Sequence, residues 1–207
     1  MKSTMKTLSK MNEKPILFRG PMVRAILEGR MTMTRRVIKP WKRISWPVET
    51  VQRGYTVTFS YKAANGIWTE TMPMVCPYGM PGDRLWVRES WRECGSIQMC
   101  DDAITPDGLL AGLDRCRYMA DGRWDGPWRP SIYMPRWASR ITLEVTAVRV
   151  ERLNAITAGD AETEGVDASN CCRIEAFERL WDSINAKRGY GWSVNPWVWV
   201  IGFQRVG

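Results

Sequence analysis

Residues 20–38 read GPMVRAILEGRMTMTRRVI, and this stretch predicts a short helix followed by a strand. Pro21 suits the first turn of a helix, where the N–H group that proline lacks would have no intrahelical partner. The apolar residues that follow at helical spacing are Val23, Ile26 and Leu27. One face of the helix is therefore apolar, and we expect Gly29 to end the helix as a left-handed cap.

The strand is predicted over residues 31–38, directly after this cap. Successive side chains of a strand point to opposite faces of its sheet. Thr34 and Arg36 therefore share one face of the strand, and Arg35 lies on the other.

The rest of the chain combines further strands with two helices. The dipeptide Asn65-Gly66 lies between two β-rich runs and predicts a hairpin over residues 55–72. Other strands are expected at residues 15–18, 84–89, 139–150 and 196–206, and helices at residues 157–165 and 174–186. We therefore expect an α+β fold, in which a small mixed β-barrel carries two or three helices on its outside.

A length of 207 residues fits one domain. We expect a flexible basic tail at residues 1–13 and a single domain over residues 14–207. Gly, Asp and Pro interrupt any regular pattern at about residues 92–130, which we interpret as a long irregular insertion or flap.

Positive charge is concentrated in the first quarter of the chain. The formal net charge is +8, and residues 1–50 hold 12 of the 30 Lys and Arg residues but 3 of the 22 acidic residues. The basic residues that follow Glu28 are Arg30, Arg35, Arg36, Lys39, Lys42 and Arg43, with Trp41 and Trp46 among them. Guanidinium groups contact phosphate and indole rings stack on unpaired bases, so this mixture favours nucleic acid as a partner. A solvated basic strand is the alternative interpretation.

Composition excludes several classes of site and location. The chain has no His, which excludes imidazole catalysis and His metal sites. The N-terminus is polar, and no apolar run is long enough to span a bilayer, so we expect no export and no membrane partner. A zinc site from Cys76, Cys94, Cys100 and Cys116 is conceivable, but no C-x-x-C pair supports it. We expect no metal and no cofactor.

Tryptophan is unusually frequent, with 12 residues. We expect most of them in the core, with Trp197 and Trp199 packed against the helices. Trp124 and Trp128 differ, because they lie in an irregular segment beside arginines. We therefore predict that Trp124 or Trp128 stacks on a base.

Four stretches of the sequence form a further pattern: KPILFRGPMVRAILEGRMTMTRRVIKP (14–40), CPYGMPGDRLWVRESW (76–91), WRPSIYMPRWASRITLEVTAVRVERL (128–153) and NPWVWVIGF (195–203). Together they resemble the ASCH domain, a PUA-like β-barrel family, and in particular the ASCH-type proteins common in tailed-phage and prophage genomes. Gly29 and Arg36 match the ends of the family signature Gly-x-Lys-x-x-x-x-Arg, whereas Met31 occupies the lysine position. The resemblance implies a cleft beside residues 29–36 that binds RNA or modified nucleosides in the cytoplasm of a bacterial host.

One branch of this family removes the acetyl group from N4-acetylcytidine with a Lys, a Thr and a Glu. The resemblance places this Thr at Thr34 and this Glu at Glu164. Glu164 lies at the end of a predicted helix, where the helix dipole raises the basicity of a carboxylate. Met31 has no amine to take a proton or polarise a carbonyl, which argues against the hydrolase activity.

Three functions follow as hypotheses. The leading one is binding of RNA, single-stranded DNA or a modified nucleobase, in which Arg30, Arg35, Arg36 and Lys39 are the basic contacts and Thr34 and Glu164 face the base. The second is an amidohydrolase or a nuclease that uses Thr34 and Glu164 as catalytic residues. The third is an interaction protein that binds a host factor.

Overall fold

The structure is a computed structural model and describes residues 13–39, 49–53, 55–62, 65–70, 73–93, 116–122, 127–166 and 172–206. Most of the predicted basic tail lies outside these ranges. Strand β1 (Glu13–Leu17) begins at the last residue of that predicted tail. No helix in the described ranges is both long enough and apolar enough to cross a membrane.

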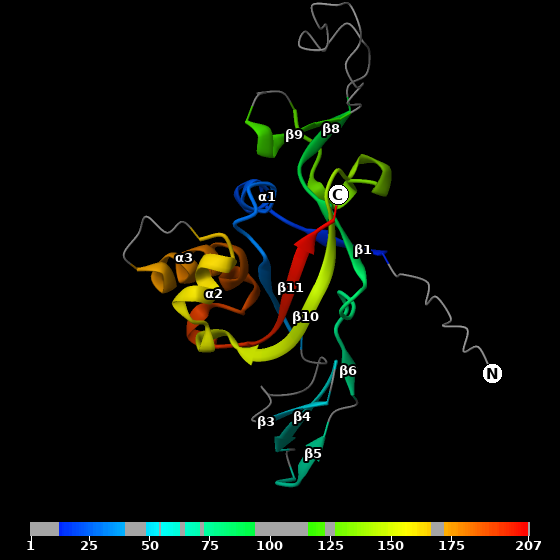
Figure 1. Cartoon of the computed structure of the whole chain (residues 1–207). Helices are drawn as coiled ribbons and strands as arrows, with labels where there is room; N and C mark the ends of the chain where they lie inside the picture. Colours follow the sequence, from blue (N-terminus) through cyan, green and yellow to red (C-terminus); the bar gives the residue numbers. More distant parts are fainter. Residues whose placement is uncertain are drawn as a thin grey trace, which may run out of the picture.

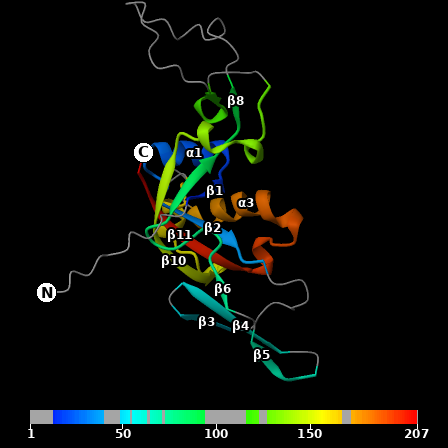
Figure 2. The ribbon, with the colours of Figure 1, turned by 90° about the vertical axis from the view of Figure 1, so that its right-hand side faces the viewer.

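A five-stranded sheet forms the centre of the molecule, as Figures 1 and 2 show from two sides. Its strands in spatial order are β1, β7 (Arg84–Arg88), β10 (Thr142–Arg152), β11 (Trp197–Arg205) and β2 (Met33–Val37). Strand β1 is parallel to β7, and the other neighbours are antiparallel. Within the described residues no backbone pairing joins the edge strands β1 and β2, so the predicted closed barrel is not seen.

The two faces of this sheet bury different apolar clusters. Helices α2 (Ala158–Thr163) and α3 (Arg173–Asn185) cover one face, where Val198 and Val200 pack among their apolar residues. Trp199 points to the other face, into the main core that also holds helix α1 (Gly20–Leu27). Trp197 packs against that main core as well. Trp199 is therefore a core residue, as predicted, and shares its core with α1; α2 and α3 instead cover the face that Val198 and Val200 occupy.

A second sheet closes one end of the main core. It consists of β3 (Glu49–Arg53), β4 (Thr56–Lys62), β5 (Trp68–Glu70) and β6 (Met74–Val75). The predicted hairpin is confirmed, since Gly66 lies in the β4–β5 connection with a φ of +82°. Val57 and Phe59 of β4 are buried in the main core.

The opposite end holds short strands and single helical turns. Strand β8 (Trp91–Glu93) pairs with β9 (Cys116–Tyr118), and the turns η2 (Met119–Asp121), η3 (Ser131–Tyr133) and η4 (Arg136–Ala138) follow. Part of the predicted irregular insertion therefore has regular structure. The remaining single turns are η5 (Leu153–Ala155), η6 (Ala186–Arg188) and η7 (Trp192–Val194).

Arg140 attaches this end to the main sheet. Its guanidinium donates two hydrogen bonds to Glu89 at the end of β7 and two to Asp121 of η2, at 2.8 to 3.1 Å. It also stacks on the ring of Tyr118, 3.9 Å from the ring centroid. Bidentate pairs of this kind are the more strongly directional form of ion pair.

The boundaries of the first two helices agree with their sequence signals. Helix α1 has Pro21 in its first turn and Gly29 beyond its end with a φ of +73°. Helix α2 begins with a capping box in which Thr157 and Asp160 each accept a hydrogen bond from the other's backbone. Gly165 follows α2 with a φ of +80°.

Gly165 provides a test of this packing. A Cβ at position 165 would lie 2.9 Å from the Cβ of Ala25, whereas nothing lies within 4 Å of a Cβ at position 29. Gly29→Ala is expected to lower the free energy of unfolding by about 1–2 kcal/mol through its backbone conformation alone. Gly165→Ala is expected to lower the free energy of unfolding by about 1–3 kcal/mol more than Gly29→Ala does, because α1 must shift. Urea unfolding of both variants measures the difference, and equal losses would contradict the close approach.

Candidate functional site

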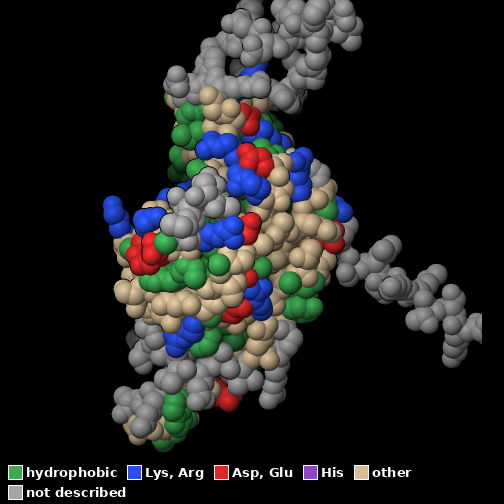
Figure 3. Space-filling model, turned by 60° about the vertical axis from the view of Figure 1, so that its left-hand side comes forward, with side chains coloured by type: hydrophobic (Ala, Val, Ile, Leu, Met, Phe, Trp, Pro, Cys, Tyr) green, Lys and Arg blue, Asp and Glu red, His purple; other side chains and the backbone are tan. Residues whose placement is uncertain are grey.

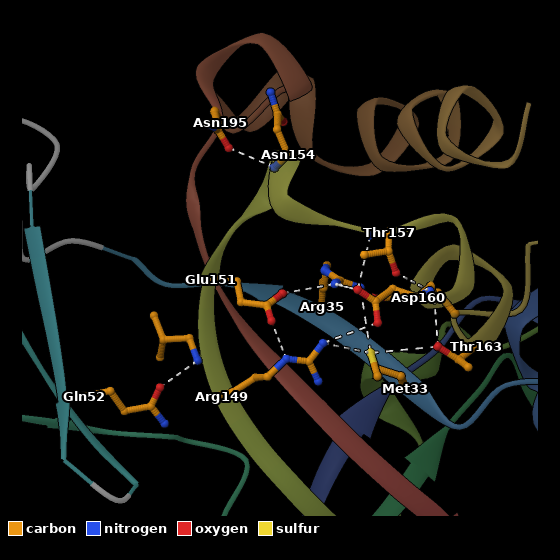
Figure 4. Close-up of polar contacts among 12 residues, drawn as sticks. Met33, Arg35, Gln52, Arg149, Glu151, Asn154, Thr157, Asp160, Thr163 and Asn195 are labelled. Carbon is orange, nitrogen blue, oxygen red and sulfur yellow. Dashed lines mark hydrogen bonds and ion pairs between the residues drawn. The ribbon is translucent and has the colours of Figure 1, made fainter.

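Arg35 lies on the face of β2 that is covered by α2 and α3. Its side chain is fully buried, and its guanidinium contacts three carboxylates. Figure 4 shows the contacts with two of them, Glu151 and Asp160. The hydrogen-bond lengths are 2.9 Å to Glu164, 3.0 Å to Asp160 and 3.2 Å to Glu151. These partners come from the end of β10, from α2 and from the residue after α2, so one side chain joins three elements. We call Arg35 and its three carboxylates the Arg35 cluster.

The cluster is extended by Arg149, two residues before Glu151 on β10. Arg149 forms ion pairs with Glu151 and Asp160 and is more exposed than Arg35. The sulfur of Met33 lies 3.8 Å from a guanidinium nitrogen of each arginine. Asp160 also caps α2, so its carboxylate links the start of that helix to the buried guanidinium.

Glu164 has the most perturbed carboxyl group of the cluster. Burial raises its pKa to about 7, although Arg35 and Arg36 act in the opposite direction. We predicted this direction from the helix dipole, but burial is the larger physical cause. Asp160 is more accessible to solvent. Burial alone would raise the pKa of Asp160, but the backbone N–H of Thr157 and the charge of Arg35 together lower it.

Thr34 and Arg36 lie on the opposite face of β2, as the alternation predicts, and face the main core. The guanidinium of Arg36 donates a 2.7 Å hydrogen bond to the carbonyl oxygen of Leu17. It lies 4.9 Å from the ring centroid of Phe18 and 5.9 Å from that of Tyr78. This side chain therefore spans the distance between the edge strands β1 and β2. We call the place where Arg36 meets Leu17, Phe18 and Tyr78, together with Thr34 two residues earlier on the same strand face, the β1–β2 seam.

One polar group at the seam has unused hydrogen-bonding capacity. The Nε atom of Arg36 is buried and has no hydrogen-bond partner among the described residues. Thr34 is 1% exposed, so its hydroxyl group is also removed from solvent. Buried polar groups of proteins are nearly always bonded, so unbonded ones indicate strain, bound water or a ligand.

The other predicted site residues are dispersed. Arg30 is exposed and pairs with Glu28, and Lys39 is exposed just beyond β2. Trp128 is half-buried, whereas Trp124 lies outside the described residues. The sequence pattern groups Arg35 with the predicted nucleic-acid-binding residues. The structure instead gives Arg35 three carboxylate partners and no exposed surface.

Thr34 and Glu164 are not bonded to each other among the described contacts, because the Glu164 carboxylate turns toward Arg35. Met31 forms a backbone bridge with Glu164 and is 2% exposed. The position at which the resembled hydrolases have a lysine is therefore a core position here.

Glu151, Arg149 and Asp160 were not identified from the sequence as members of this cluster. A usable signal was present, since Arg149 and Glu151 share one face of β10. Charged residues on a strand face that helices cover need partners from those helices.

The cysteines do not form a metal site in the described part of the chain. Cys76 is buried in the main core, and Cys116 is buried in a small cluster with Trp91. Cys94 and Cys100 lie outside the described residues. Among the described residues no group of three His, Cys, Asp or Glu side chains is arranged to hold a metal ion.

No family model and no curated protein matches the sequence. The fold is similar to two solved structures. One is a protein of Enterococcus faecalis V583 described with the family-model DUF984, with a TM-score of 0.42 and 11% identity over 95% of this chain and 81% of that chain. The other is an ASCH domain from Lactobacillus crispatus JV V101, with a TM-score of 0.42 and 11% identity over 94% of this chain and 79% of that chain.

Arg35→Met tests the Arg35 cluster. The variant leaves carboxylates buried without their cation, and we expect it to lower the free energy of unfolding by about 3–5 kcal/mol. The matched control is Arg30→Met, which removes an exposed pair and should cost about 1 kcal/mol or less. Similar losses in both variants, measured by urea unfolding, would mean that the buried guanidinium does not connect these elements.

Glu164 predicts a pH dependence of stability. Between its ordinary value of 4.5 and about 7, folded Glu164 keeps a proton that the unfolded chain releases, so its contribution to stability falls as pH rises through this window. The difference is at most about 3 kcal/mol. Glu164→Gln should remove this part of the pH dependence, whereas Glu162→Gln, at an exposed position nearby, should not. An unchanged pH profile for Glu164→Gln would contradict the raised pKa.

Proposed function

We propose that the protein binds an unpaired nucleobase, ordinary or modified, of RNA or single-stranded DNA at the β1–β2 seam. The observation that carries this proposal is the position of Arg36 between two aromatic rings at the junction of the edge strands. Its buried Nε lacks a described partner, and Thr34, two residues before it on the same face of β2, is buried.

The chemistry of these groups suits the edge of a base. A guanidinium donates hydrogen bonds in a fixed plane, and a hydroxyl group both donates and accepts. Base edges present acceptors and donors in the same plane, and unpaired bases are read by such contacts together with aromatic stacking. Phe18 and Tyr78 supply the rings at the seam.

Exposed cations lie at both ends of the same segment. Arg30 precedes β2 and Lys39 follows it, and these residues are proposed to contact phosphates on either side of the base. Glu164, whose pKa is close to neutrality, and Trp128 are proposed as further contacts. The resemblance of residues 14–40 to the ASCH signature supports the same class of ligand. A phage origin and a host-protein partner stay predictions.

No observation favours the hydrolase over binding alone, because Met31 supplies no amine and Glu164 is bound to Arg35. The experiment should nevertheless include N4-acetylcytidine among the nucleosides. Its conversion to cytidine by the wild-type protein would replace the binding proposal with an enzymatic one.

Thr34→Val tests the proposed site. The variant keeps the shape of the side chain and removes only the hydroxyl, so the protein should unfold at the same denaturant concentration or slightly later. We expect the affinity for nucleosides and short oligonucleotides, measured by calorimetry, to fall about ten-fold. Arg36→Lys should weaken binding as well, because lysine cannot form the planar contact.

The matched control is Thr58→Val, on strand β4 of the second sheet, which should leave affinity unchanged. Oligonucleotide affinity of the wild type should also fall steeply with salt. Absence of binding at low salt, or equal affinity of wild type and Thr34→Val, would overturn the proposal.

A further inference from the structure

The end of the molecule that carries β8 and β9 combines arginines with aromatic rings. Residues 84–93, 116–122 and 127–140 contain seven Arg and three acidic residues, together with six Trp and Tyr residues. On the face seen in Figure 3, Lys and Arg side chains gather toward this end. The positive charge of the chain is therefore not confined to its first 50 residues.

Four large apolar side chains are exposed at this end. The exposed fractions are 73% for Tyr133, 59% for Ile132, 57% for Trp137 and 50% for Met119. We call these four residues the aromatic platform. Large exposed apolar patches on soluble proteins commonly mark binding surfaces.

The platform is held by the fold. Tyr133 and Trp137 lie in the short turns η3 and η4, each preceded by a proline at its N-cap. The residues that follow them, Met134 and Ala138, are 1% and 2% exposed and anchor the turns in a small core with Trp91. The rings are therefore presented to solvent by a fixed backbone, which lowers the entropic cost of binding.

Arginines beside the platform are held largely by rings and carbonyl groups. Arg88 donates to the carbonyl oxygen of Ile132 at 3.2 Å and stacks 4.6 Å from the ring centroid of Trp86. Arg129 lies 5.3 Å from the ring centroid of Trp91, and its distance to Glu93 is 4.0 Å, the length of a weak ion pair. Trp91 in turn contacts the edge of Trp137, with 5.7 Å between centroids.

Arg88 and Arg129 stack on the buried rings of Trp86 and Trp91 and reach the exposed rings through their neighbours. Arg88 bonds to Ile132, which precedes Tyr133, and Trp91 beneath Arg129 contacts Trp137. Arg140 differs, because Glu89 and Asp121 neutralise it within the fold. A cation that stacks on a ring retains N–H groups at its edge for an anion. Stacking rings next to such cations match the alternating bases and phosphates of an unpaired strand.

We propose that the aromatic platform is a second nucleic-acid surface, which binds single-stranded RNA or DNA with bases stacked on Tyr133 and Trp137 and phosphates on Arg88 and Arg129. A duplex does not fit this chemistry, because its bases are already stacked on each other. The aromatic platform is proposed to bind the same class of ligand as the β1–β2 seam but contains none of the seam residues. Either proposal can therefore fail without the other.

Tyr133 offers the cleanest test, because it is the most exposed ring of the platform. The probe is fluorescein-labelled oligouridylate or oligothymidylate of about 12 nucleotides, titrated with the full chain at low salt and followed by anisotropy. Tyr133→Ala is expected to weaken binding about ten-fold, while Tyr133→Phe keeps the ring and should bind like the wild type. Tyr55→Ala, at another exposed tyrosine, is the matched control and should have no effect.

Trp137→Ala provides a second measurement, with Trp68→Ala as its control at a similarly exposed tryptophan. The platform is supported if Tyr133→Ala and Trp137→Ala weaken oligonucleotide binding, the control variants do not, and the binding of free nucleosides stays intact. Loss of nucleoside binding in Thr34→Val reports on the seam alone. Unchanged oligonucleotide affinity in both platform variants, equal binding of a duplex, or binding only to proteins would overturn the proposal.

Discussion

The positive charge of a buried guanidinium must be balanced by nearby negative charge, and the arrangement of β2, β10 and α2 follows from that requirement. Removing Arg35 from water is costly unless carboxylates of good geometry surround it. Glu151, Asp160 and Glu164 supply them from three elements, and Asp160 is at the same time the cap of α2. The position of the helix on the sheet is therefore specified by charge as well as by apolar packing. A shift of α2 along β2 would separate these ions.

The same strand serves two purposes because its side chains alternate. Arg35 points toward the helices, and its neighbour Arg36 points toward the main core and the seam. Fixing Arg35 in the helix-facing cluster also fixes Thr34 and Arg36, since a shift of register by one residue would exchange the two faces. Arg35 thus helps to determine the geometry of the proposed binding site from the opposite face of the strand. The charges of Arg35 and Arg36 both act to lower the pKa of Glu164, so this carboxyl group interacts electrostatically with arginines on both faces of β2.

Local signals predicted much of the fold. The proline and glycine around α1, the capping box of α2 and the turn at Gly66 each depend on a few adjacent residues. The face of β11 that α2 and α3 cover was not predictable in this way. Alternation places Trp199 and Val200 on opposite faces of the strand but does not indicate which elements pack against each face. Glu164 shows the same limit. Its position near a helix end was evident, but its burial and its pairing with Arg35, 129 residues away, depend on tertiary structure.

The β1–β2 seam has a consequence for motion. Where a continuous sheet would be joined by a ladder of backbone hydrogen bonds, the described contacts between the edge strands are one side-chain hydrogen bond, from Arg36 to Leu17, and the contact of Arg36 with the ring of Phe18 just after β1. Such contacts amount to a few kcal/mol, on the order of 1.5–3 for the charged hydrogen bond. A rotamer change of Arg36 would break these contacts without unfolding any strand. We therefore expect any separation of β1 from β2 beside the main core to depend on the conformation of this one side chain.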